Sequence, residues 1–364
     1  MKLILHIGTH KTGSTALQHF LIANPVPLAA LGIHYAAPAS GIKASLVVHL
    51  LHVHNKPAMH EFFVSHLEAA RRNGAHTLVV SAESFYGMTL VPALCRRQPC
   101  ADLHDRDHVL IRRLRASIPE NDVNPEVVCY FRRPDHFAES WYNQHVKYGS
   151  LFAGDFSEFL GLVYPALLYN QYIKRWVDVF GKANCSIRMY ENIDKSVIDD
   201  FMHGVLNISD LSTFVTTHDA VNERMSRDLL EFKKTVNKNA MYEEMSLERK
   251  IFRALDENMT LRETEPDYYQ AFLSPDERAE LLKELSEEMA ALESSFGVPS
   301  FPDFDLEAAK AAWRPYPGLG PARQEALERE YGHMSRRLRF RVERLFVRIR
   351  KALRNEMRVV VGTR

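Results

Sequence analysis

A loop with two glycines, placed between an apolar run and a helical segment, constrains the fold of this chain more than any other feature. It reads G-T-H-K-T-G-S-T at positions 8–15 and leads into helical spacing over 15–23. When such a loop joins a strand to a helix in a parallel sheet, backbone N–H groups and the helix N-terminus meet at the carboxyl edge of the strands. Lys11 adds a positive charge, and Ser14 and Thr15 add hydroxyl donors. The loop therefore predicts a phosphate-binding site rather than an ordinary turn.

Four apolar runs have the length and composition of buried strands. They are residues 3–7, 77–81, 126–131 and 185–190. Segments of ten or more residues with helical periodicity separate them, and this alternation is typical of βαβ units. We therefore expect an α/β fold with three layers, in which a parallel sheet of the P-loop type is flanked by helices.

The C-terminal part of the chain has a different character. Residues 225–296 have helical periodicity, whereas residues 299–321 contain five prolines and resemble a packed linker. We expect one domain over residues 1–310, followed by a Pro-rich linker and a basic, amphipathic helical extension over residues 311–364.

The charge balance argues against a nucleic-acid-binding protein. Lys and Arg together number 46, and so do Asp and Glu, so the net charge is zero. The charges are unevenly distributed, however, because residues 323–364 contain 13 basic and 5 acidic residues. A basic tail therefore follows an acidic body.

Cysteine use and hydropathy favour a cytoplasmic protein. Four cysteines in 364 residues do not form a disulfide framework, and they lack the spacing of a zinc site. The N-terminal apolar run is too short for a signal peptide, and no segment reaches the roughly 18 apolar residues of a membrane span. The cysteines are Cys95, Cys100, Cys129 and Cys185.

A second candidate phosphate site follows the strand at 126–131. It reads R-R-P-D-H-F-A-E-S over 132–140, and Pro134 is suited to the first turn of a helix. Arg132 in the loop and Ser140 two turns further on would together clamp a phosphate. Two arginines before a helix are also common on solvated surfaces, so this motif is weak when it is taken alone.

An ATP-binding Walker loop is the first alternative for the glycine loop. The Walker pattern G-x-x-x-x-G-K-[ST] requires a lysine where this chain has Ser14, and the lysine here is Lys11. The strand at 77–81 is followed by Ala82 and Glu83, with no Asp to help hold Mg²⁺. The sequence therefore favours a phosphate site that does not depend on a metal–ATP complex.

Taken together, the motifs resemble those of PAPS-dependent sulfotransferases, most closely the bacterial carbohydrate-type branch. H-I-G-T-H-K-T-G-S-T-A-L-Q at 6–18 resembles the family's 5′-phosphosulfate loop, and Y-F-R-R-P-D-H-F-A-E-S at 130–140 resembles its 3′-phosphate motif. R-M-Y-E-N at 188–192 resembles a strand end near the adenine, and S-A-E at 81–83 also fits this branch. The resemblance covers residues 1–298, which makes 1–310 a sulfotransferase domain, although the family's late R-K-G motif has no match here.

The resemblance implies that PAPS (3′-phosphoadenylyl sulfate) is the co-substrate, without a metal ion. Arg132 and Ser140 would hold the 3′-phosphate, and Tyr190 would lie near the adenine. Arg133 occupies a position that varies in the family. The residues that would bind the 5′-phosphosulfate are Lys11, Thr12, Gly13, Ser14 and Thr15.

Sulfuryl transfer requires a base for the acceptor hydroxyl and a positive charge near the leaving phosphate. Lys11 is placed to meet the charge that develops on the bridging oxygen. Glu83 follows the strand at 77–81 after Ala82, and this places it at the same edge of the sheet as the glycine loop. Since the family uses either Glu or His as the base, Glu83 is our predicted base. The alternative is that Glu83 caps a helix or pairs with a lysine.

Among the 17 histidines, His49 is our second candidate for the base. His49, His52 and His54 do not have the spacing of a metal site on one helical face, so no metal site is expected. His10, within the loop, is expected to form a wall of the pocket.

The basic tail has an apolar stripe with two interpretations. Its members, at helical spacing and surrounded by arginines, are Leu338, Val342, Leu345, Ile349 and Leu353. Such a helix either lies on an anionic membrane surface or docks on the acidic body.

The sequence thus predicts transfer of a sulfuryl group from PAPS to a hydroxyl of a carbohydrate or glycolipid acceptor. The protein would act in the cytoplasm, or at the inner face of the membrane if the tail binds lipid. The alternatives are a P-loop nucleotide kinase and a non-catalytic, membrane-associated nucleotide-binding protein.

Overall fold

The computed structural model of the chain divides it into two compact units. The first unit comprises Met1–Tyr142, Asp155–Glu223 and Leu273–Ala312, and the second comprises Asn143–Gly154, Arg224–Phe272 and the chain from Trp313 onward. The residues described are 1–37, 57–90, 94, 102–119, 123–149, 152–194, 196–216, 224–238, 245–257 and 271–337. The predicted division into 1–310 and 311–364 stays a prediction.

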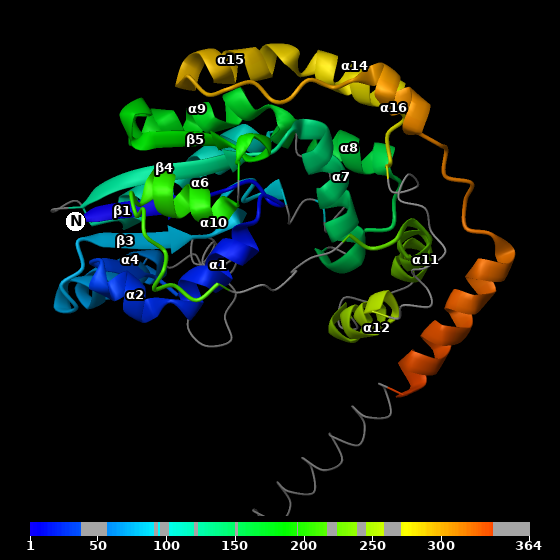
Figure 1. Cartoon of the computed structure of the whole chain (residues 1–364), viewed down its shortest axis with the longest axis horizontal. Helices are drawn as coiled ribbons and strands as arrows, with labels where there is room; N and C mark the ends of the chain where they lie inside the picture. Colours follow the sequence, from blue (N-terminus) through cyan, green and yellow to red (C-terminus); the bar gives the residue numbers. More distant parts are fainter. Residues whose placement is uncertain are drawn as a thin grey trace, which may run out of the picture. The chain divides into compact units, whose positions relative to one another are not determined.

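The first unit contains a five-stranded sheet in which all neighbouring strands are parallel (Figure 1). Its strand order is β2-β3-β1-β4-β5. The strands are β1 (Lys2–His6), β2 (Ile33–Tyr35), β3 (Thr77–Ser81), β4 (Asn124–Phe131) and β5 (Cys185–Met189). Because β1 is central and the chain adds strands on both of its sides, the loop after β1 opens at the point where ligands bind in such sheets.

The four predicted strands are present, with ends that differ by at most two residues. The sequence reading missed β2, a three-residue strand that pairs only with β3 at the edge of the sheet. A segment of three residues is too short to show a period of two, so the apolar pattern did not reveal it.

Helices cover both faces of the sheet. On one face, α1 (Ser14–Ala23), α2 (Pro25–Ala30) and α10 (Val197–Asp200) share a buried apolar cluster with side chains of β1, β3 and β4. The other layer consists of α4 (Pro57–Arg72), α6 (Leu103–Ser117) and α9 (Tyr169–Phe180), which contact one another in that order. Within it, α4 packs on β3, and α9 packs on β4 and β5. The predicted three-layer α/β fold is confirmed.

Other helical segments of the chain differ in detail from what the sequence predicts. The chain after β4 forms α7 (Pro134–Gln144), whose first residue is the Pro134 that was expected in a first helical turn, and then a π-helical turn, His145–Gly149. The segment 225–296 is interrupted by non-helical residues 271–274, after which Ser274 and Glu277 form a capping box for α14 (Pro275–Glu284). α15 (Ser286–Phe296) ends at Gly297, and the predicted linker contains a short helix, α16 (Leu306–Ala312).

The second unit is built from α11 (Arg227–Asn237), α12 (Met245–Glu257) and a helix over residues 321–337. The Tyr331 ring packs edge-on against Phe232 and tilted against Phe252, and its hydroxyl donates a hydrogen bond of 2.8 Å to Glu248. The beginning of the basic tail therefore docks on α11 and α12.

The stripe from Leu338 to Leu353, on which the membrane prediction depends, lies outside the described residues. In the part of the chain that the structure describes, no helix combines the length and the apolar character needed to cross a bilayer. Binding of the tail to a membrane remains a prediction.

The contacts of Tyr331 predict how much the tail stabilises the second unit. Tyr331→Ala should lower the free energy of unfolding by about 2 kcal/mol, the scale for burying an aromatic side chain. Tyr331→Phe keeps the ring and should lose only about 1 kcal/mol, the scale for one hydrogen bond. Urea unfolding measures both, and Arg329→Ala, on the exposed side of the same helix, should change stability by less than about 0.5 kcal/mol. Equal stability of Tyr331→Ala and wild type would contradict the docking.

Candidate active site at the carboxyl edge of the sheet

The glycine loop after β1 is tied to the end of β4. Both the backbone N–H and the hydroxyl of Thr9 donate to the carbonyl of Tyr130, each at 3.0 Å, and the Thr12 hydroxyl donates to the Thr9 carbonyl at 2.7 Å. The backbone is left-handed at Lys11 (φ 69°) and Gly13 (φ 76°), after which α1 begins. Since the N–H groups of a first helical turn have no acceptor within the helix, this end of α1 is suited to bind an anion.

Gly13 is required by close packing as well as by its backbone angle. A Cβ atom at this position would lie 2.7 Å from Cγ1 of Val197, the first residue of α10, and 3.8 Å from the Tyr190 ring. Ser14 is buried and Thr15 is half-buried at the start of α1. The loop is therefore enclosed on one side by side chains that follow β5.

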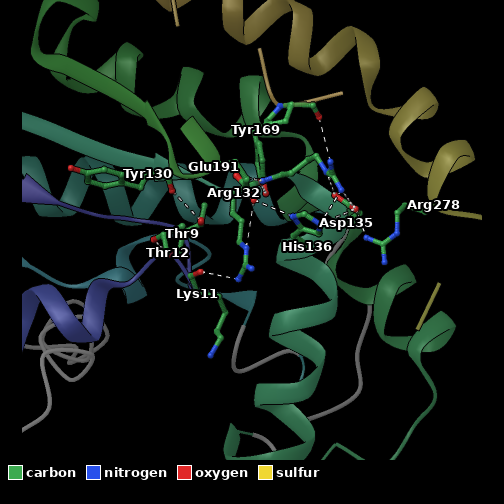
Figure 2. A network of polar contacts seen from close by, with 12 residues as sticks. Thr9, Lys11, Thr12, Tyr130, Arg132, Asp135, His136, Tyr169, Glu191 and Arg278 are labelled. Carbon is green, nitrogen blue, oxygen red and sulfur yellow. Dashed lines mark hydrogen bonds and ion pairs between the residues drawn. The ribbon is translucent and has the colours of Figure 1, made fainter. Parts of the chain in front are cut away.

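Arg132 connects the end of β4 to the glycine loop (Figure 2). Its Nη1 donates to the carbonyl of Lys11 at 3.1 Å, and its guanidinium carbon lies 5.6 Å from the centroid of the Tyr190 ring. Nε lies 3.6 Å from Oε1 of Glu191 and is buried without a hydrogen-bond partner among the described residues. The structure thus brings together Lys11, Arg132 and Tyr190, which the sequence analysis had selected from three separate motifs.

The neighbouring arginine has a different role. Arg133 is 8% exposed and forms a bidentate pair with Asp135, with distances of 2.8 and 2.9 Å. Asp135 also binds Arg278 of α14. Burial raises the pKa of Asp135, but the hydrogen bond from Arg133 and the charges of His136, Arg278 and Arg133 outweigh it and lower the pKa to about 2. Asp135 therefore joins α7 to α14 through Arg278, and Arg133 is bound to the same carboxylate, whereas Arg132 faces the loop.

Glu191 organises this strand end, although the sequence analysis did not select it. Its Oε2 accepts the backbone N–H of Arg133 at 2.9 Å, and its Oε1 lies 3.3 Å from Nδ1 of His136. The Tyr169 hydroxyl donates to the carbonyl of Arg132 at 2.8 Å. Glu191 belongs to the R-M-Y-E-N segment that the sequence analysis selected for Tyr190. Its own role was not predictable from that segment, because its partners lie more than 50 residues away in the sequence.

Ser140 is half-buried on α7, two turns beyond Arg132. Among the described residues, no hydrogen bond joins Ser140 to Arg132. Its predicted role at a second phosphate stays a prediction.

Glu83 lies at the same edge of the sheet, at the start of a 3₁₀ turn (Glu83–Phe85) that is separated from β3 by Ala82. Its Oε2 accepts a hydrogen bond of 2.7 Å from Nε2 of Gln18, on α1. In the described residues, the partner of this carboxylate is therefore an amide rather than a lysine. Its position beside α1 agrees with the predicted edge, while its role as a base stays a prediction.

His10 lies within the loop and stacks on Trp141 of α7, with ring centroids 5.0 Å apart. Burial lowers the pKa of His10, the charge of Glu83 raises it, and the charge of Lys11 lowers it, with a net shift downward. The lowered pKa favours the neutral imidazole. Its Nε2 is buried without a hydrogen-bond partner in the described part of the chain. His49, the other candidate base, lies outside the described residues.

The described residues contain no group of three or more His, Cys, Asp or Glu side chains that could hold a metal ion. The groups at this edge of the sheet are the loop backbone, two cationic side chains, a carboxylate and an imidazole. Such a set can bind a ligand with more than one anionic group and can accept a proton from a neighbouring hydroxyl.

Comparison with known proteins gives a distant likeness among solved structures. No protein-family model matches the chain, and no curated protein matches it in sequence. Among solved structures, a sulfotransferase from Alicyclobacillus acidocaldarius is similar, with 15% sequence identity and a TM-score of 0.40. The similarity covers 84% of this chain and 98% of that one.

Close packing at Gly13 leads to a prediction with an internal control. Gly13→Ala should destabilise the protein by more than Gly74→Ala, because both positions have positive φ but only Gly13 has an atom in the way. The left-handed backbone alone costs about 1 to 2 kcal/mol, and overpacking adds about 1 to 3 kcal/mol. Thermal or urea unfolding measures the difference.

Val197→Ala removes the Cγ1 atom that the new Cβ would meet. The loss of stability in the double variant Gly13→Ala/Val197→Ala should therefore be smaller than the sum of the two single losses. Additive losses would show that the clash is relieved in another way.

Proposed function

We propose that this protein transfers a sulfuryl group from PAPS to a hydroxyl of a carbohydrate or glycolipid acceptor. The observation that carries the proposal is the contact of Arg132 with the carbonyl of Lys11, which joins the ends of β4 and β1. PAPS has anionic groups at both its 5′ and 3′ positions, and a site with cationic residues from two strand ends can bind both of them.

The residues present fit such a ligand. The loop and the first turn of α1 would hold the 5′-phosphosulfate through Lys11, Thr12, Gly13, Ser14 and Thr15, and Arg132 with Ser140 would hold the 3′-phosphate. The buried Nε of Arg132 has no hydrogen-bond partner among the described residues, and a ligand oxygen would supply one. The Tyr190 ring lies beside both Gly13 and Arg132, where it would contact the base of the nucleotide.

The reaction would use two side chains at the edge of the sheet. When bound, PAPS supplies a sulfuryl group whose bond to the phosphate oxygen breaks as the acceptor oxygen attacks. Glu83 takes the proton of the acceptor hydroxyl, and Lys11 stabilises the negative charge that develops on the phosphate. Gln18 binds Oε2 of Glu83, so Oε1 is the atom that we assign to the proton.

A nucleotide kinase is the alternative that uses the same loop. Ser14 stands where a Walker loop has its lysine, and Lys11 lies instead within a left-handed turn. Both features support a donor that does not need a metal–triphosphate complex. Turnover with PAPS would exclude a purely nucleotide-binding function.

The choice of ligand predicts different thermal shifts. PAP, the product nucleotide, should stabilise the native protein by about 2.7 kcal/mol at a concentration one hundred times its Kd, and ATP with Mg²⁺ should have a much smaller effect. Differential scanning fluorimetry measures both. Arg132→Ala should lose most of the shift with PAP, while Arg113→Ala, an exposed arginine of α6, should keep it. Equal stabilisation by ATP with Mg²⁺ would overturn the assignment of the donor.

The assignment of roles predicts which variants lose turnover. Lys11→Ala and Glu83→Gln should each lower kcat at least about a hundredfold, the scale for losing a charge stabiliser or a base. Lys174→Ala and Glu61→Gln, at exposed positions, serve as controls, and transfer of labelled sulfate from PAPS is the assay. Activity should persist in EDTA, because the proposed reaction uses no metal ion. Strict metal dependence would instead point to a nucleotide kinase. If Glu83→Gln stays active and His49→Ala does not, the base is His49.

A further inference from the structure

We propose that Gln18 is a positioning residue that fixes the Glu83 carboxylate relative to the phosphate-binding loop. This inference rests on the proposed function, because it assigns Glu83 the role of the base. Gln18 is 8% exposed and lies on α1. Its Nε2 is 2.7 Å from Oε2 of Glu83, while its distances to the hydroxyl and carbonyl oxygens of Ser81 are 3.3 and 3.4 Å.

Ser81 is itself held from the other side. His6 and Ser81 end the adjacent strands β1 and β3 in register, and Nδ1 of His6 lies 2.8 Å from the Ser81 hydroxyl. His6 is fully buried, and burial lowers its pKa to about 4, so the ring is neutral at pH 7. A continuous polar chain therefore runs from His6 through Ser81 and Gln18 to Glu83.

Gln18 also belongs to the helix that begins at the phosphate-binding loop. It lies four residues after Ser14, and both side chains are buried. Residues spaced by four lie on the same face of a helix. One rigid helix thus carries both the anion-binding N–H groups and the amide that holds the Glu83 carboxylate. In the proposed reaction, this helix therefore sets the distance between the bound sulfuryl donor and Glu83.

The chemistry of the amide suits this role. An amide N–H₂ group donates to a carboxylate but does not compete for the proton that the base must take. A displacement of about 1 Å at a reacting group can lower a rate about a hundredfold. Loss of the Gln18 amide should therefore affect the chemical step rather than the binding of the nucleotide.

The first experiment separates kcat from KM. Gln18→Met removes the amide and keeps an unbranched side chain of similar length. We expect kcat to fall at least tenfold, while KM for PAPS and the thermal shift with PAP change less than twofold. Gln171→Met is the matched control, because Gln171 makes the same kind of 2.7 Å bond to Glu288 at an exposed site; it should leave kcat unchanged. A loss that appears only in KM, or an unchanged kcat, overturns the proposal.

The second experiment tests whether Gln18 acts through Glu83. In a Glu83→Gln background, Gln18→Met should lower kcat by less than a further twofold, because the carboxylate that it positions is already gone. A full tenfold further loss would show that Gln18 acts on another group.

A crystal structure of Gln18→Met provides a test that does not require activity. The Glu83 carboxylate should leave the position in which it meets α1, while the Gly8–Thr15 loop should be unchanged. A carboxylate that stays in place overturns the positioning role. If the wild-type protein transfers no sulfuryl group, the proposed function fails, and this structural test still decides whether Gln18 holds Glu83.

Discussion

The pair of hydrogen bonds from Thr9 to the carbonyl of Tyr130 is the contact on which the geometry of the candidate site depends. It joins the loop after β1 to β4, two residues before Arg132. Because the two strands are parallel neighbours, their carboxyl ends meet at one edge of the sheet. The register of the sheet therefore brings Arg132 to the loop, where it binds the carbonyl of Lys11.

The two consecutive arginines at this edge have different roles because they bind different partners. Arg133 binds Asp135, whereas Arg132 binds the carbonyl of Lys11. Arg133 is bound by a carboxylate with a pKa of about 2, so that pair is charged at any physiological pH. The depressed pKa of Asp135 contributes stability that is present above its unfolded value of about 4 and is lost as the pH falls toward 2. Since Arg133 is committed to this buried network, Arg132 is the arginine that faces the loop.

The sequence predicted the elements whose signals are local and missed those that depend on distant partners. The apolar runs predicted four of the strands, and the glycine loop predicted the edge of the sheet at which the candidate site lies. β2 was too short to show periodicity. Glu191 and Gln18 stand within recognised motifs, yet their roles depend on residues 55 and 65 positions away. One sequence without structure gives no signal for such pairs.

The bond from Gln18 to Glu83 matters because Glu83 and the positively charged Lys11 lie at the same edge of the sheet. A lysine bound directly to Glu83 would neutralise the carboxylate and hold it in an ion pair, which weakens it as a base. An amide donor fixes the same carboxylate without adding a charge. In the proposed reaction, the negative charge of Glu83 is then used on the acceptor hydroxyl, and the positive charge of Lys11 is used on the leaving phosphate. Because Gln18 lies on α1, which begins three residues after Lys11, its amide ties the Glu83 carboxylate to the helix that follows the loop.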